Sequence, residues 1–122
     1  FPNLHNPNVR LAEKQKAKYH ALCVMAGNFS CLLWQRLFDG LADEFDIPPH
    51  TADVYLRQQA ENLFGDYKKA LTGPLSRGDA ATISRNLKAL DGDPFKEIYE
   101  AFVEAYPSIS KQTQKIRERK AS

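Results

Sequence analysis

Three polar residues stand at helical spacing in and beside an apolar stretch: Lys16, His20 and Asn28. Residues 19–35 contain no Asp, Glu, Lys or Arg, yet His20 and Asn28 fall within them. Successive helical residues are rotated by about 100°, so residues four or eight apart share a face. Two interpretations of His20 and Asn28 are open. They are hydrogen-bonded core residues, or they are polar groups presented to a second body.

Large apolar side chains occupy the other side of the same predicted helix. At about 100° per residue they form one stripe, called here the leucine stripe: Leu22, Met25, Phe29, Leu32, Leu33 and Leu37. A helix that is apolar on nearly all sides must be covered on more than one face. We expect the leucine stripe to pack on the chain's own core and the face with His20 and Asn28 to meet a second body. A membrane span is disfavoured, because His, Asn, Ser, Gln and Gly interrupt the run.

Length and charge limit the classes of function. The chain has 122 residues and 43% hydrophobic content, which suits one compact domain with a sizeable core. Its net charge is +2, but residues 111–122 carry five Lys or Arg against one Glu, so the remainder is at about −2. A nucleic-acid-binding body is therefore excluded by charge. The short basic tail is typical of a frayed helix or a disordered terminus.

The two cysteines, Cys23 and Cys31, are eight residues apart. On a helix this spacing corresponds to about 12 Å along the axis, which is beyond the reach of a disulfide. We therefore expect buried free thiols in a reducing compartment, and a cytoplasmic protein. The chain shows no signal peptide and begins at Phe1 rather than Met, so we expect it to be a fragment of a longer protein.

Helical periodicity and stop signals predict an all-helical domain over residues 10–107, preceded by an arm over residues 1–9 and followed by a basic tail, frayed or disordered, over residues 108–122. The predicted helices cover residues 10–46, 52 to 65 or 70, 80–90 and 94–106. Asp79 and Asp93 are the predicted caps of the last two. Residues 71–79 contain two Gly and one Pro and form a tight, specified loop.

Several chemistries lack a signature. The sequence has no GxGxxG dinucleotide fingerprint and no CxxC or HxxxH spacing. His5, His20 and His50 are too scattered to indicate a metal, and we predict none. No Ser has His and Asp partners that the sequence identifies.

Two segments carry a resemblance to a known family. Lys16-x-x-Tyr19-His20 with Asn28, together with the segment ALTGPLSRGDAAT over residues 70–82, resembles the C-terminal domain of a family of Rossmann-like oxidoreductases. In that family a helical domain of unknown function follows a dinucleotide-binding domain. The resemblance covers about residues 12–104. It implies a helical fold of the 6-phosphogluconate dehydrogenase C-terminal type, with one long N-terminal helix and three or four shorter ones.

The resemblance also implies roles for the three polar residues. In the broader relatives, which include β-hydroxyacid dehydrogenases and ketopantoate reductases, the helical domain closes over the nicotinamide and commonly forms the dimer. These relatives commonly carry Lys-x-x-x-Asn on this helix, whereas here His20 follows Lys16. Reduction of a carbonyl needs a proton donor and a group that stabilises the oxyanion. Lys16 or His20 is the expected donor, and Asn28 the orienting group.

The segment over residues 70–82 supplies candidates for substrate binding. Thr72 and Arg77 are candidates for binding an anion, because an Arg fork suits a carboxylate. Asn62, on the preceding helix, is a weaker candidate. The alternative is structural: Arg77 pairs with Asp79, and the loop glycines serve only backbone angles.

We therefore expect a cytoplasmic C-terminal domain that binds a small-molecule substrate and forms a homodimer in an NAD(P)-dependent oxidoreductase, with reduction of a small 2-oxo acid as the most concrete activity. NADP or NAD would be bound mainly by an N-terminal Rossmann domain absent from this chain, so the chain alone is predicted to be inactive. The alternative is a stand-alone helical module for protein interaction or dimerisation, without catalysis.

Overall fold

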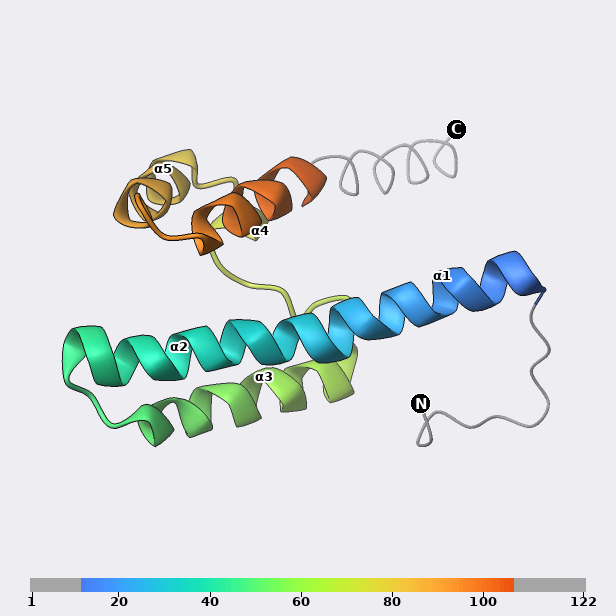
Figure 1. Cartoon of the computed structure of the whole chain (residues 1–122), viewed down its shortest axis with the longest axis horizontal. Helices are drawn as coiled ribbons and strands as arrows, with labels where there is room; N and C mark the ends of the chain where they lie inside the picture. The colour runs from blue at the N-terminus through green and yellow to red at the C-terminus, as the bar shows by residue number, and fades with distance from the viewer. Residues whose placement is uncertain (1–11, 107–122) are drawn as a thin grey trace. The chain divides into compact units, whose positions relative to one another are not determined.

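A computed structural model describes residues 12–106. This part of the chain contains no strand, which confirms the all-helical prediction with its long N-terminal helix and shorter following ones. The elements are α1 (Glu13–Cys23), the π-helix η1 (Val24–Phe29), α2 (Ser30–Phe45), the 3₁₀-helix η2 (Pro49–Ala52), α3 (Asp53–Asp66), α4 (Pro74–Arg77), α5 (Ala80–Ala89) and a helix over residues 95–106 (Figure 1). The predicted arm and basic tail lie outside the described residues, and the domain bounds stay predictions.

The first three elements form one continuous helix, Glu13–Phe45, of 33 residues (Figure 1). It ends where Asp46 adopts the left-handed conformation (φ 53°) and the Ile47 N–H bonds back to the Leu41 carbonyl at 2.7 Å. Asp tolerates this conformation better than most residues, and Pro48 and Pro49 then prevent the helix from continuing. The helix therefore ends within one residue of its predicted end at residue 46.

By length and composition, the helix Glu13–Phe45 is long and apolar enough to cross a bilayer. Signal sequences and the core helices of water-soluble proteins share these two properties, so they are weak evidence for a membrane span. His20, Asn28 and Ser30 interrupt the apolar stretch and disfavour a lipid-facing role.

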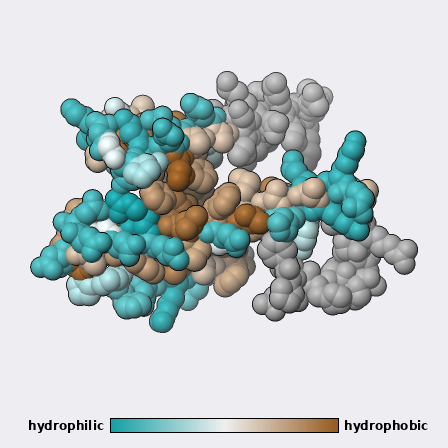
Figure 2. Space-filling view, in the orientation of Figure 1, coloured by the Kyte–Doolittle hydropathy of each residue, from teal (hydrophilic) through white to brown (hydrophobic). Residues whose placement is uncertain are grey.

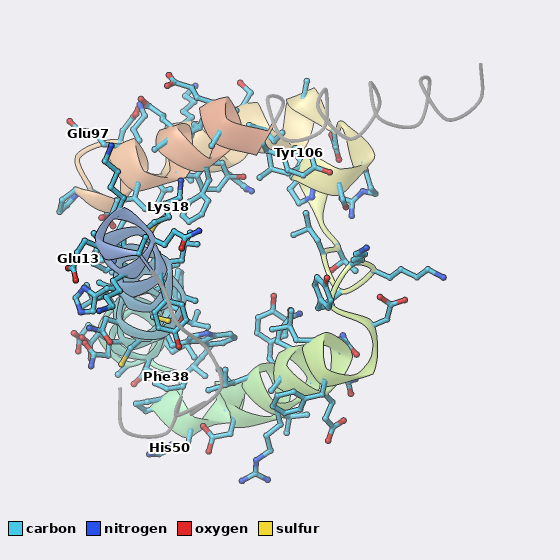
Figure 3. The ribbon with its side chains drawn as sticks, turned by 90° about the vertical axis from the view of Figure 1, so that its right-hand side faces the viewer. Glu13, Lys18, Phe38, His50, Glu97 and Tyr106 are labelled. Atoms are coloured by element: carbon cyan, nitrogen blue, oxygen red, sulfur yellow. The ribbon has the colours of Figure 1, made fainter. Side chains whose placement is uncertain are left out.

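The chain divides into two compact units, Phe1–Gln58 and Gln59–Ser122, with the division inside α3. In the first unit, α2 packs on η2 and the start of α3 through aromatic rings. The Trp34 ring lies 5.4 Å from that of Tyr55 and 6.3 Å from that of Phe38. Phe38 in turn lies 6.3 Å from the ring of His50, and Figure 3 shows these two side chains together. These contacts hold the short helices against α2.

In the second unit, local caps and one longer contact organise the helices. The Asp79 carboxylate accepts the Thr82 N–H at 3.1 Å, so the predicted cap of α5 is confirmed. The Asp93 carboxylate accepts the N–H of Phe95 at 2.8 Å, at the start of the helix over residues 95–106. The Asn86 side chain donates to the Tyr99 hydroxyl at 3.0 Å, which joins that helix to α5.

Little of the described chain is buried. Among residues 12–106 the buried hydrophobic residues are Ala52 and Ala70, and no large side chain is fully buried. The described residues of neither unit therefore form, within that unit, the sizeable core that we expected. The expectation that the leucine stripe packs on that core is wrong too, because every member is exposed. Hydrophobic surface is visible on the face shown in Figure 2.

The cysteines are free, as expected from their spacing. Their predicted burial is wrong: Cys23 is half-buried and Cys31 is exposed. The Cys31 sulfur accepts a hydrogen bond from the Gln35 side chain at 3.6 Å.

Candidate functional site

The π-helix η1 lies where the sequence placed the candidate site: it contains Asn28 and directly follows α1, which contains His20. A π-turn closes over five residues instead of four, which acts as one additional residue in the helix. Side chains on the two sides of η1 are therefore offset by about 100° relative to a uniform α-helix. The four-residue spacing from Lys16 to Asn28 assumed such a uniform helix and does not hold across η1.

The Ser30 side chain stabilises the irregular turn. Its hydroxyl donates to the Ala26 carbonyl and, at 3.2 Å, to the Gly27 carbonyl. A hydroxyl that bonds back to the preceding turn satisfies carbonyls that a regular ladder would pair with N–H groups. The sequence analysis missed this role of Ser30. The signal for it is that Ser30 follows the small residues Ala26 and Gly27 by four and three residues. π-turns are frequent at functional sites.

Lys16 is exposed on α1. Its ammonium lies 3.4 Å from the Glu13 carboxylate, and the side chains of the two residues are 59% and 92% exposed. An ion pair at this exposure is weak, so the ammonium can exchange Glu13 for another acceptor.

His20 and Asn28 are also exposed. This excludes the interpretation that they are core residues held by buried hydrogen bonds. Tyr19, next to His20, has a raised pKa because of partial desolvation and, secondarily, the neighbouring Cys23 thiol. The long helix thus carries a cation, an imidazole and an amide that are all accessible from solvent.

The geometry of the loop before α5 agrees with the structural alternative, in which the glycines serve backbone angles and Arg77 pairs with Asp79. Gly73 (φ 95°) and Gly78 (φ 66°) have left-handed backbones that favour glycine. The one-turn helix α4 lies between them, and the Ser76 hydroxyl donates to the Gly73 carbonyl at 2.9 Å. The Arg77 guanidinium lies 3.6 Å from the Asp79 carboxylate, the pairing that the structural alternative anticipated.

The charge of this loop is partly compensated. Hydrogen bonds from Thr82, and then the Arg77 charge, hold the pKa of Asp79 below its usual range. The Thr82 hydroxyl donates to Asp79 at 2.7 Å and accepts from the Arg85 guanidinium at 3.0 Å. Sequence reasoning missed Arg85, which reaches Thr82 because residues three apart on a helix are neighbours.

The substrate-binding candidates differ in accessibility. Arg77 and Thr72 are exposed, whereas Asn62 on α3 is half-buried. The Arg77 guanidinium pairs with Asp79 through Nη2 at 3.6 Å, and since a guanidinium carries five N–H donors, it has donors with which to bind an anion.

The candidate residues are divided between the two units. Lys16, His20 and Asn28 belong to the first, and Asn62, Thr72 and Arg77 to the second. All of these residues except the half-buried Asn62 are exposed. Within residues 12–106, no three His, Cys, Asp or Glu side chains gather as a metal site would require.

These features define a class: an all-helical domain whose long, π-interrupted helix displays both apolar and polar side chains. The chain belongs to the family described as a domain of unknown function (DUF2520), whose model matches residues 1–106. Searches among curated proteins and among solved structures found no match.

Proposed function

We propose that this chain is the substrate-binding and dimerisation domain of a cytoplasmic NAD(P)-dependent oxidoreductase that reduces a small 2-oxo acid. The observation that carries the proposal is the exposed long helix. Its apolar side chains lack cover in the first unit, and its polar groups Lys16, His20 and Asn28 face solvent. A helix of this kind requires neighbours outside its own unit. A second copy and an N-terminal Rossmann domain would supply them.

The chain's own residues would act on the substrate carbonyl. The Lys16 ammonium or the His20 imidazolium would donate a proton to the carbonyl oxygen as negative charge develops there. The Asn28 amide would donate a hydrogen bond that orients the substrate. A nicotinamide bound by the Rossmann domain would supply the hydride to the carbonyl carbon. The sequence has no dinucleotide fingerprint, so none of its residues is assigned to the cofactor.

The loop before α5 would bind the substrate carboxylate. Arg77 has an exposed side chain whose charge is paired with Asp79 at 3.6 Å, and Thr72 lies five residues earlier in the same loop. Replacing the single ion pair to Asp79 by a bidentate carboxylate contact would strengthen both directionality and charge pairing. Asn62 is the further candidate for a hydrogen bond to the substrate.

Turnover by the complete protein tests this function. The full reading frame that contains this sequence should encode a strand followed by a glycine-rich fingerprint before Phe1. Its product should oxidise NADPH or NADH in the presence of 2-oxo acids, and the 122-residue chain alone should not. Reduction by the isolated chain, or a complete protein without a nucleotide-binding domain, would contradict the proposal.

The alternative is a stand-alone helical interaction module, which the same exposed apolar side chains favour. It differs in what lies upstream: a native start near Phe1 supports the module. It also differs at Lys16 and His20, whose replacement would leave partner binding unchanged in a module whose contacts are apolar.

A further inference from the structure

Two arginines of the second unit are connected to one carboxylate. Nη2 of Arg77 lies 3.6 Å from Oδ2 of Asp79, and the Thr82 hydroxyl donates to the same oxygen at 2.7 Å. Nη2 of Arg85 donates to that hydroxyl at 3.0 Å. Asp79 therefore positions both guanidinium groups, one directly and the other through Thr82, although they are eight residues apart in the sequence.

The backbone fixes the position of this carboxylate. The Asp79 N–H donates to the Pro74 carbonyl at 2.9 Å, and Oδ1 of the same residue accepts the Thr82 N–H at 3.1 Å. Asp79 is half-buried, whereas Arg77 and Arg85 are exposed. A supported carboxylate thus holds two guanidinium groups that are accessible to a ligand.

The segment that contains these residues is basic in an otherwise acidic domain. Residues 67–88 carry five Lys or Arg and one acidic residue, Asp79. The other residues of the range 12–106 carry six Lys or Arg and 13 Asp or Glu. Positive charge gathered in one segment attracts anions to it.

The charge next to the two arginines exceeds what Asp79 compensates. Lys88 is exposed and follows Arg85 by three residues on α5, so the two are neighbours on the helix. Together with Arg77 they place three cations against one carboxylate, which gives a net charge of +2. Two carboxylates would balance this charge. A carboxylate with a phosphate monoester would exceed it, because the phosphate alone carries about −1.5 to −2.

We propose that the loop binds a 2-oxo dicarboxylate, with Arg77 on the carboxylate beside the carbonyl and Arg85 on the distal carboxylate. The proposal rests on the proposed function, which assigns one substrate carboxylate to Arg77, and it adds Arg85 and a second carboxylate. Nη2 of Arg85 contacts Thr82, and since a guanidinium carries five N–H donors, it has donors with which to bind a carboxylate.

A matched pair of ligands tests the second carboxylate. 2-Oxoglutarate and 2-oxopentanoate share a five-carbon chain and differ at its distal end, which is a carboxylate in the first and a methyl group in the second. Both are titrated into the 122-residue chain at low ionic strength, where charge pairing is least screened, and binding is followed by NMR. The dicarboxylate should bind about tenfold more tightly. Equal affinities, or no binding of either ligand, would overturn the proposal.

Variants of Arg85 test its role. Arg85→Gln should weaken binding of 2-oxoglutarate to the level of 2-oxopentanoate and leave binding of the latter unchanged. Arg85→Lys keeps the charge without the fork and should retain part of the preference. Arg57→Gln, at an exposed position of α3, is the control and should retain all of it. A preference that persists in Arg85→Gln contradicts the assignment. So does an equal loss for both ligands, because it would mean that Arg85 only supports the loop through Thr82.

Turnover by the complete protein separates this proposal from the proposed function. The value of kcat/KM should be about tenfold higher for 2-oxoglutarate than for 2-oxopentanoate. Equal turnover of the two acids would refute the dicarboxylate and support the oxidoreductase. No turnover of either acid, together with a binding preference that depends on Arg85, would refute the oxidoreductase and support the dicarboxylate site.

Discussion

At the scale of single residues, the proposed chemistry depends on three exposed side chains of the long helix. Lys16, His20 and Asn28 contribute little to packing, because all three face solvent. Exposure is what a group needs if it is to meet a substrate held partly by another domain. Because these side chains are exposed, their replacement can change activity without changing the stability of the fold.

We expect Lys16→Ala or His20→Ala, whichever removes the proton donor, to lower kcat of the complete enzyme at least a hundredfold, the size typical of a lost general acid. The melting temperature should stay unchanged, since surface substitutions rarely affect stability. Steady-state kinetics and thermal unfolding measure the two quantities. Lys18→Ala, on the same helix, is the control and should retain full activity. A fall in melting temperature without loss of rate would favour a structural role.

The cap formed by Asp79 should make the stability of the chain depend on pH. Asp79→Ala removes the cap of α5 and should lower the melting temperature by about 5 °C. The folded pKa of Asp79 lies below its ordinary value, so its contribution is complete above the unfolded pKa, about 3.9, and is lost as pH falls through the lower folded pKa. Unfolding followed from pH 6 to pH 2 should show the parent and Asp79→Ala converging. Asp79→Asn, which retains an acceptor, should lose less.

At the scale of elements, the caps and ends of helices could be predicted from the sequence, whereas the side of the long helix that packs could not. The Asp79 cap joins residues three apart, and Pro48 and Pro49 act on their own backbone, so the sequence contains what determines them. The π-helix depends on a small balance between two hydrogen-bond patterns, which periodicity does not register. The exposure of the leucine stripe was not predicted, because periodicity identifies an apolar face without identifying what covers it.

Trp34 is the main packing residue between α2 and the start of α3. It is half-buried and lies against Phe38 and Tyr55. We expect Trp34→Ala to lower the unfolding free energy by about 2 kcal/mol, less than the 3–5 kcal/mol of a fully buried aromatic residue. Denaturant titration measures this change. Arg57→Ala, on the exposed side of α3, is the control; an equal loss there would show that the ring contacts are not what stabilises the unit.

At the scale of the whole molecule, many large apolar side chains of the described residues are exposed. Residues such as Leu22, Phe29 and Leu32 are exposed by half, and Ala52 and Ala70 are the buried hydrophobic residues of the described part. The composition gives the number of apolar residues but not where they are buried. A chain that buries them inside its own core and a chain that buries them against another chain or domain can have the same composition. Family membership agrees with the helical domain, and its activity remains our proposal.

The mass of the 122-residue chain in solution is the most direct test of the claim that its apolar surface is covered by a second copy. Sedimentation equilibrium at micromolar concentrations should give about twice the 13.8 kDa of one chain. Dilution should cause dissociation and loss of helical signal together, because the exposed helix loses its cover. A folded, cooperatively unfolding species of 13.8 kDa across the whole concentration range would contradict the claim.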